Sequence, residues 1–226
     1  SNRHTNKERW RAAPQRGPLS FFFSPYSMTA HSAGAQPHHN YGGDGAGLVC
    51  GYLMQGSVPA TPLDSTEAAR WLQAHPQATP TVQGGTPRAV AAPFVWLHFN
   101  LAHAQALRWI QRHAQLPDAF FEALKEGSHS TRIERDDDAL VGVLNDAHFD
   151  FAFEPFDIAT LWICVLPHVV ITARAHPLRS VDALRTAVRQ GYTPRSSVAL
   201  LEQLMRTQAA GLVDIVRGVT QRIDGI

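Results

Sequence analysis

The clearest pattern in this chain is a series of short apolar runs bounded by glycine, proline and aspartate. Runs of this length that are rich in β-branched and aromatic residues are typical of strands. One of them, 94–100, is apolar almost throughout, which predicts an interior strand. Strands are predicted at 48–54, 94–100, 131–135, 139–153, 158–166 and 169–173, and the last two are predicted to pair as a hairpin.

Other segments carry apolar residues three and four positions apart, which is the spacing of one helix face. Helices are predicted at 65–74, 103–114, 117–127, 181–190 and 196–226. Asp64 or Ser65 can cap the first of them. The inward positions are predicted to be Ala69 and Leu72 in the first helix, and Leu107 and Ile110 in the second.

Antiparallel hairpins beside strand–helix units predict an α/β fold with a mixed, α+β-like sheet and helices on its faces. Residues 1–46 are rich in Ser, Gly, Pro, His and Asn, and they predict a flexible N-terminal tail. The folded domain is expected to span 47–195, and 196–226 is expected to form one long helix.

The last helix is the most unusual predicted element. Its stripe runs through Leu201, Met205, Leu212, Ile215, Val219, Ile223 and Ile226, with polar Gln208 in one slot. About thirty residues reach roughly 45 Å, which exceeds what a domain of this size needs. No terminator precedes Ile226, so we expect the helix to continue in a longer parent protein. Val219, Ile223 and Ile226 are expected to be unpaired within one chain.

Composition narrows the function classes. The formal net charge is +1, which gives no electrostatic case for binding nucleic acid. Cys50 and Cys164 lie far apart in apolar runs and predict buried, reduced thiols. The longest apolar run, 158–172, is interrupted by Pro167 and is too short to span a bilayer.

Candidate metal ligands alternate along one predicted strand. Asp146, His148 and Asp150 would share one face, and carboxylate and imidazole groups suit a divalent ion such as zinc. The alternative is a solvent-facing strand end without bound metal. His98 is interpreted as a partly buried, hydrogen-bonded histidine or a turn contact, with a metal ligand as the alternative. Residues 136–138 are interpreted as a hairpin tip, with an acidic site that attracts cations as the alternative. No phosphate-binding loop, GxSxG, HExxH or CxxC motif is present, which weakens the case for an enzyme.

An ordered set of segments resembles the cytoplasmic domain of the CorA-type metal ion transporters, and the ZntB-like zinc transporter branch in particular. The segments are Trp96-Leu97-His98-Phe99-Asn100, a helix containing Trp109, Leu116-Pro117-Asp118 through Ala123-Leu124, Ser130-Thr131-Arg132-Ile133-Glu134, Val169 to Arg174, and the long helix. The resemblance covers about 48–226. It implies an αβα sandwich whose last helix continues as a stalk into two membrane helices, with five subunits around an ion path.

The resemblance also implies metal positions between subunits. Glu122 corresponds to an acidic position on the short helix, and Asp224 to one on the stalk. The stalk carries Arg217 and Arg222 where the magnesium branch is acidic, which favours the ZntB-like branch. No cofactor is required on this reading, and Zn²⁺ or Mg²⁺ would be a ligand or cargo.

The expected function is therefore non-enzymatic. The chain is expected to be the cytoplasmic domain of a transporter in the bacterial inner membrane, assembled as a pentamer and attached through C-terminal helices that follow this sequence. Two alternatives stay open. One is a soluble metal-dependent hydrolase that uses Asp146, His148 and Asp150, and the other is a non-catalytic oligomerisation domain.

Overall fold

The computed structural model describes residues 43–76, 92–127, 130–147 and 158–224. These residues belong to one compact unit, 39–226. Most of the predicted tail, 1–42, lies outside the described residues, as do the positions of His148 and Asp150. Among the described residues, no helix is both long and apolar enough to cross a membrane.

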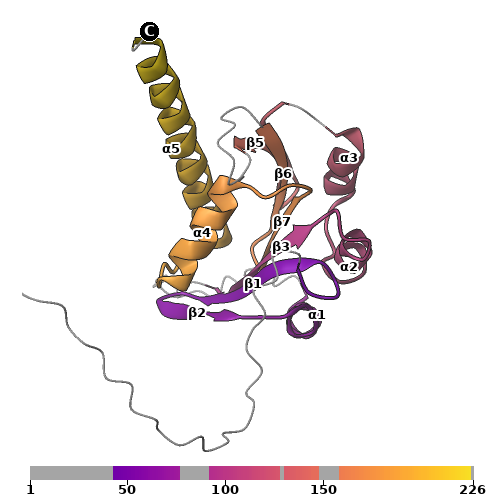
Figure 1. Ribbon diagram of the computed structural model, residues 1–226. Helices are drawn as coiled ribbons and strands as arrows, with labels where there is room; N and C mark the ends of the chain where they lie inside the picture. The colour runs from indigo at the N-terminus through magenta and orange to yellow at the C-terminus, as the bar shows by residue number, and fades with distance from the viewer. Residues whose placement is uncertain (1–42, 77–91, 128–129, 148–157, 225–226) are drawn as a thin grey trace, which may run out of the picture. The chain divides into compact units, whose positions relative to one another are not determined.

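A seven-stranded mixed sheet forms the centre of the unit (Figure 1). Its strands are β1 (Leu48–Gln55), β2 (Val58–Pro62), β3 (Phe94–Asn100), β4 (Arg132–Asp136), β5 (Ala139–Ala147), β6 (Ile158–Val165) and β7 (Val169–Arg174). Their order is β2-β1-β3-β7-β6-β5-β4. Only β3 and β7 pair in parallel, and β6 and β7 form the predicted antiparallel hairpin.

Helices cover both faces of the sheet. They are α1 (Ser65–Ala74), α2 (Ala106–His113), α3 (Asp118–Glu126), α4 (Arg179–Arg189) and α5 (Ser197–Asp224). One apolar cluster packs α1, α2 and α3 on one face, and a second packs α4 and α5 on the other. In Figure 1 the two helix layers flank the strands. The predicted αβα sandwich with a mixed sheet and a long last helix is confirmed.

Local sequence signals account for several element ends. Asp64 caps α1 through a complete capping box with Glu67, with a distance of 2.7 Å from the Glu67 amide nitrogen to Asp64 Oδ1. Gly127 ends α3 in the left-handed region at φ 57°, where glycine has no Cβ penalty. Asp137, at φ 48°, forms the tight β4–β5 turn that was predicted for 136–138.

Other predictions were wrong in detail. The edge strand β2 was not predicted, because Pro59 and Pro62 interrupt its pattern. Leu107 is 41% exposed, and Ala106 faces inward beside Ile110 instead. In α1 the inward residue is Ala68 and not Ala69. In both helices the first inward residue lies one position earlier than predicted, whereas Leu72 and Ile110 are buried as predicted.

Candidate functional site

The predicted metal ligand Asp146 is buried at the end of β5, with 4% of its surface exposed. Its Oδ2 accepts hydrogen bonds from the Ser180 amide at 3.0 Å and from the Ser180 hydroxyl at 2.5 Å. Ser180 lies in the first turn of α4, whose own N-cap residue Leu178 makes no side-chain hydrogen bond. Asp146 therefore caps α4 from a distant strand, and the solvent-facing alternative was wrong for this residue.

The other predicted ligands do not join Asp146 among the described residues. Glu122 is exposed on α3, on the opposite face of the sheet from α4 and α5. Asp224 ends α5, and its side chain lies outside the description, as do His148 and Asp150. Within the described ranges, no three His, Cys, Asp or Glu residues are close enough to hold a metal ion. The metal assignments therefore stay predictions.

A buried polar network connects β3 and β7 beneath α4. The Thr172 hydroxyl accepts a hydrogen bond from Trp96 Nε1 at 2.9 Å, lies 2.9 Å from His98 Nδ1, and contacts the Leu97 carbonyl at 3.4 Å. Arg174 Nε lies 3.2 Å from His98 Nε2. Because a guanidinium can only donate, Nε2 must accept and Nδ1 must carry the proton. His98 is therefore neutral and hydrogen-bonded, as interpreted from the sequence, but it is fully and not partly buried, with 1% of its surface exposed.

Burial is the main cause of the perturbed pKa values in this network. Burial and then the positive charges of Arg174 and Arg185 hold the pKa of His98 well below its usual value. Burial raises the pKa of the nearby Cys50 thiol to about 12, which favours the protonated thiol at neutral pH. Burial also raises the pKa of Cys164 to about 12. Both cysteines are free and buried, as predicted.

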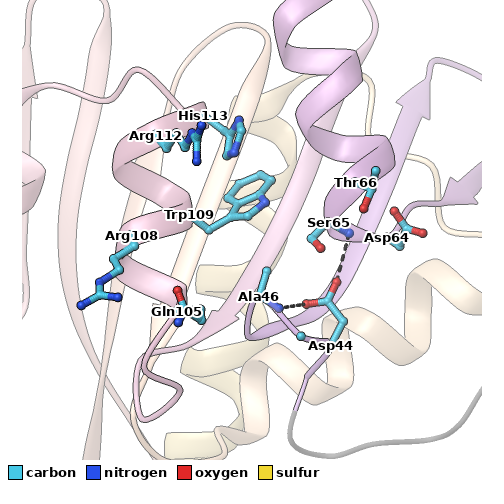
Figure 2. A pocket seen from close by; sticks show the side chains of 11 residues that line it. Asp44, Ala46, Asp64, Ser65, Thr66, Gln105, Arg108, Trp109, Arg112 and His113 are labelled. Atoms are coloured by element: carbon cyan, nitrogen blue, oxygen red, sulfur yellow. Dashed lines mark hydrogen bonds between the residues drawn. The ribbon is translucent and has the colours of Figure 1, made fainter.

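A groove of about 740 Å³ lies between α1, α2 and the turn before β1 (Figure 2). Asp44 is the most constrained residue on its rim. One carboxylate oxygen accepts from the amides of Ala46 and Leu48 at 2.9 and 3.0 Å, and the other accepts from the Ser65 amide at 3.0 Å. This carboxylate fixes its own turn before β1 and joins that turn to the start of α1, so it is committed to structure.

The remaining groove residues do not form a catalytic set. Arg108, Arg112 and His113 line one wall, and the two arginines are balanced by Asp44 and Asp64 on the other side. Burial, followed by the charge of Arg112, lowers the pKa of His113. The sequence did not point to this groove, because its lining comes from three separate segments that carry no shared motif.

The feature with the clearest functional character is the second half of α5. Leu200, Leu201, Leu204 and Gln208 are buried against the sheet and α4, and beyond Gln208 no described side chain of the helix is buried. Leu212 is 43% exposed, Val216 64% and Ile223 66%. Figure 1 shows this part of α5 running past the end of the sheet. An apolar stripe at helical spacing that stays exposed among the described residues is typical of an interaction surface.

The prediction for the end of the stripe is confirmed where the structure describes it. Ile223 is 66% exposed and is not covered by any described part of the chain, and the side chains of Val219 and Ile226 lie outside the described residues.

Comparison with known proteins gives one family. The model of the family "CorA-like Mg2+ transporter protein" matches residues 91–226. A curated relative, the zinc transport protein ZntB of Pectobacterium carotovorum subsp. carotovorum (strain PC1), is 22% identical over 102 residues. That alignment covers 45% of this chain and 31% of the relative.

Solved structures show the same fold. The full-length CmaX protein superposes with a TM-score of 0.64 at 20% identity, over 81% of this chain and 52% of its own. The ZntB cytoplasmic domain from Vibrio parahaemolyticus gives 0.57 at 18% identity, over 79% and 64%. The soluble domain of CorA from Methanocaldococcus jannaschii gives 0.52 at 12% identity, over 77% and 62%. The chain spans less than two thirds of each of these proteins.

Proposed function

The chain belongs to the CorA-like Mg2+ transporter protein family, and from this we propose that it is the cytoplasmic domain of a divalent metal cation transporter of the bacterial inner membrane. On this proposal it performs no bond chemistry. It contributes to the ion pathway, to the assembly of a homopentamer and to gating, and the last helix leads toward the membrane part. The membrane, and further copies of this chain, are its partners.

The observation that carries the proposal is the division of α5 at Gln208. The first part packs on the sheet, whereas the second part exposes Leu212, Val216 and Ile223 on a helix that leaves the domain. Exposed apolar side chains on an isolated helix are unfavourable in water, and packing against equivalent helices would bury them. Gly211 and Gly218 lower the intrinsic helix propensity of this part, which adds to the need for partner helices.

We infer zinc as the favoured ion ahead of magnesium. The second part of α5 carries Arg217, paired with Asp214 at 3.5 Å, and so offers no purely acidic surface of the kind that holds Mg²⁺ through carboxylates. Glu122 and Asp224 remain the proposed metal positions between subunits. Both would need oxygen or nitrogen ligands from a neighbouring copy, because among the described residues no metal-binding group forms within one chain.

Sedimentation velocity tests the assembly part. The wild-type chain is expected to self-associate with rising concentration, and Val216→Glu to remain monomeric because a charge would be buried in the helix interface. Val198→Glu is the matched control: Val198 is 54% exposed on the same helix, but at its domain-bound start. A monomeric wild type, or equal loss in both variants, would refute assembly through this surface.

Titration calorimetry tests the ion part, with ZnCl₂ and MgCl₂ added separately. Zinc is expected to bind and to increase self-association. Glu122→Gln is expected to weaken this effect, while Glu202→Gln, which removes an exposed carboxylate from the first part of α5, is not. An absence of heat and of any change in sedimentation with either ion would refute ion binding by this domain and leave its family membership intact.

No specific observation favours the alternatives. A hydrolase needs a metal with an open coordination position. Asp146 instead accepts two hydrogen bonds from Ser180. A simple oligomerisation domain would use the same surface of α5 and is distinguished by stoichiometry, because it predicts dimers that do not respond to divalent ions.

A further inference from the structure

The end of β5 contacts both helices on its face of the sheet. The Asn145 carbonyl accepts a hydrogen bond from Gln208 Nε2 of α5. The next residue, Asp146, accepts two hydrogen bonds from Ser180 of α4. Two consecutive residues of one strand therefore fix α4 at its first turn and α5 near its middle.

Gln208 is unusual among the contacts of α5. It is the last of the buried residues of the helix among those described, only 8% exposed, and the others are Ser197 at the helix start and the apolar Leu200, Leu201 and Leu204. It occupies an apolar slot of the stripe, although a leucine there would bury more apolar surface. A buried amide on an otherwise apolar face fixes relative position, because its hydrogen bond is satisfied in one arrangement only.

Distances along the helix show what this contact controls. From Ser197 to Gln208 the helix is held over about 16 Å, and from Ser197 to Leu204 over about 10 Å. The part that extends from Gln208 to Asp224 is about 24 Å long. Without the Gln208 contact the supported length falls by about a third, and the angular freedom of the extended part rises about 1.5-fold.

We propose that Gln208 is the positioning residue that sets the direction of the second half of α5 relative to the sheet. The end of β5, through Asn145 and Asp146, joins this direction to the position of α4. The link from this geometry to gating rests on the proposed function, whereas the positioning role itself does not.

Distances between two nitroxide labels test the proposal in the whole chain. Labels are placed at Gln111→Cys on α2 and Thr220→Cys on α5, both exposed positions. Native Cys50 and Cys164 are buried and stay unlabelled. Dilution with unlabelled protein removes distances between chains, so the measurement is valid whether or not the chain self-associates.

Three alanine variants give the comparison. Gln208→Ala is expected to widen the distance distribution about 1.5-fold, in line with a supported length that is shorter by about a third. Leu204→Ala is expected to lower the melting temperature more, yet to leave the width unchanged, because Ser197 and Gln208 still hold the full length. Gln221→Ala, an exposed glutamine on the same helix, is expected to change neither.

An unchanged width in Gln208→Ala would overturn the proposal, and so would equal widening in Leu204→Ala. Circular dichroism checks that the helix is retained. If Gln208→Ala loses helicity, Gln208→Met takes its place, since methionine keeps the side-chain length but donates no hydrogen bond. Widening in that variant supports the proposal and an unchanged width overturns it. A failure of self-association in sedimentation would refute the proposed assembly through α5 and not this inference.

Discussion

Replacing Asp146 with alanine removes the cap of α4 without touching the helix itself. Ser180 is 3% exposed, so neither its amide nor its hydroxyl can turn to water when the carboxylate is gone. Both hydrogen bonds, at 3.0 and 2.5 Å, come from this one residue of α4. The helix stays in place through the apolar contacts of Val181, Leu184 and Val188. The expected effect is therefore partial destabilisation.

The magnitude follows from the buried donors. Leaving a buried donor unsatisfied costs about 1–3 kcal/mol, and loss of an N-cap costs about 0.5–2 kcal/mol. These figures describe the same contacts and are not added, so we expect the free energy of unfolding to fall by about 2–3 kcal/mol in Asp146→Ala. For a domain of this size that lowers the melting temperature by about 5–10 °C. Asp146→Asn keeps an acceptor oxygen but loses the charge at the helix N-terminus, so a smaller loss of about 1 kcal/mol in the free energy of unfolding is expected.

Urea unfolding in the presence of EDTA measures these values without divalent ions. A double-mutant cycle with Ser180→Ala should give a coupling of about 1 kcal/mol, because the two side chains contact each other directly. A loss below about 0.5 kcal/mol in Asp146→Ala, or a larger loss in Asp146→Asn than in Asp146→Ala, would refute the capping argument. If only stabilisation by added Zn²⁺ disappeared, Asp146 would instead be a metal ligand.

Three further predictions follow from the buried core. His98 is neutral in the native state, whereas in the unfolded state it binds a proton below about pH 6.5. The free energy of unfolding should therefore fall as the pH drops below about 6.5, by up to about 1.4 kcal/mol per pH unit. Urea unfolding between pH 7.5 and 5.5 should give a flatter dependence for His98→Gln, and parallel curves would contradict the assignment. Cys50 and Cys164 should not react with Ellman's reagent at pH 8 until the chain is unfolded, and immediate reaction would show that they are accessible. In Gly51→Ala the new Cβ would lie 2.7 Å from the Leu63 carbonyl oxygen, so the free energy of unfolding should fall by about 2 kcal/mol and the melting temperature by about 5 °C. Gly45→Ala, which places its Cβ in open space, should leave the melting temperature unchanged.

Local signals in the sequence were enough for most elements, because caps, turns and apolar period act over a few residues. The capping box at Asp64 and the left-handed Gly127 were both readable from residue type and spacing. The inward face of α2 was not, since Ala106 and Leu107 fit the same period and only the neighbouring strand selects between them. The edge strand β2 was not predicted for a similar reason: its two prolines interrupt the alternating pattern, and its strand conformation depends on pairing with β1.

The sequence by itself determined the mixed sheet, the two buried thiols and the length of the last helix, because each rests on composition or on a period within one segment. Only the tertiary structure decided what Asp146 and Gln208 do. Their roles depend on Ser180 and Asn145, which lie 34 and 63 positions away along the chain. A hydrogen bond across that separation leaves no periodic trace in the sequence, so neither the bonds that Asp146 accepts from Ser180 of α4 nor the contact of Gln208 with β5 was predicted.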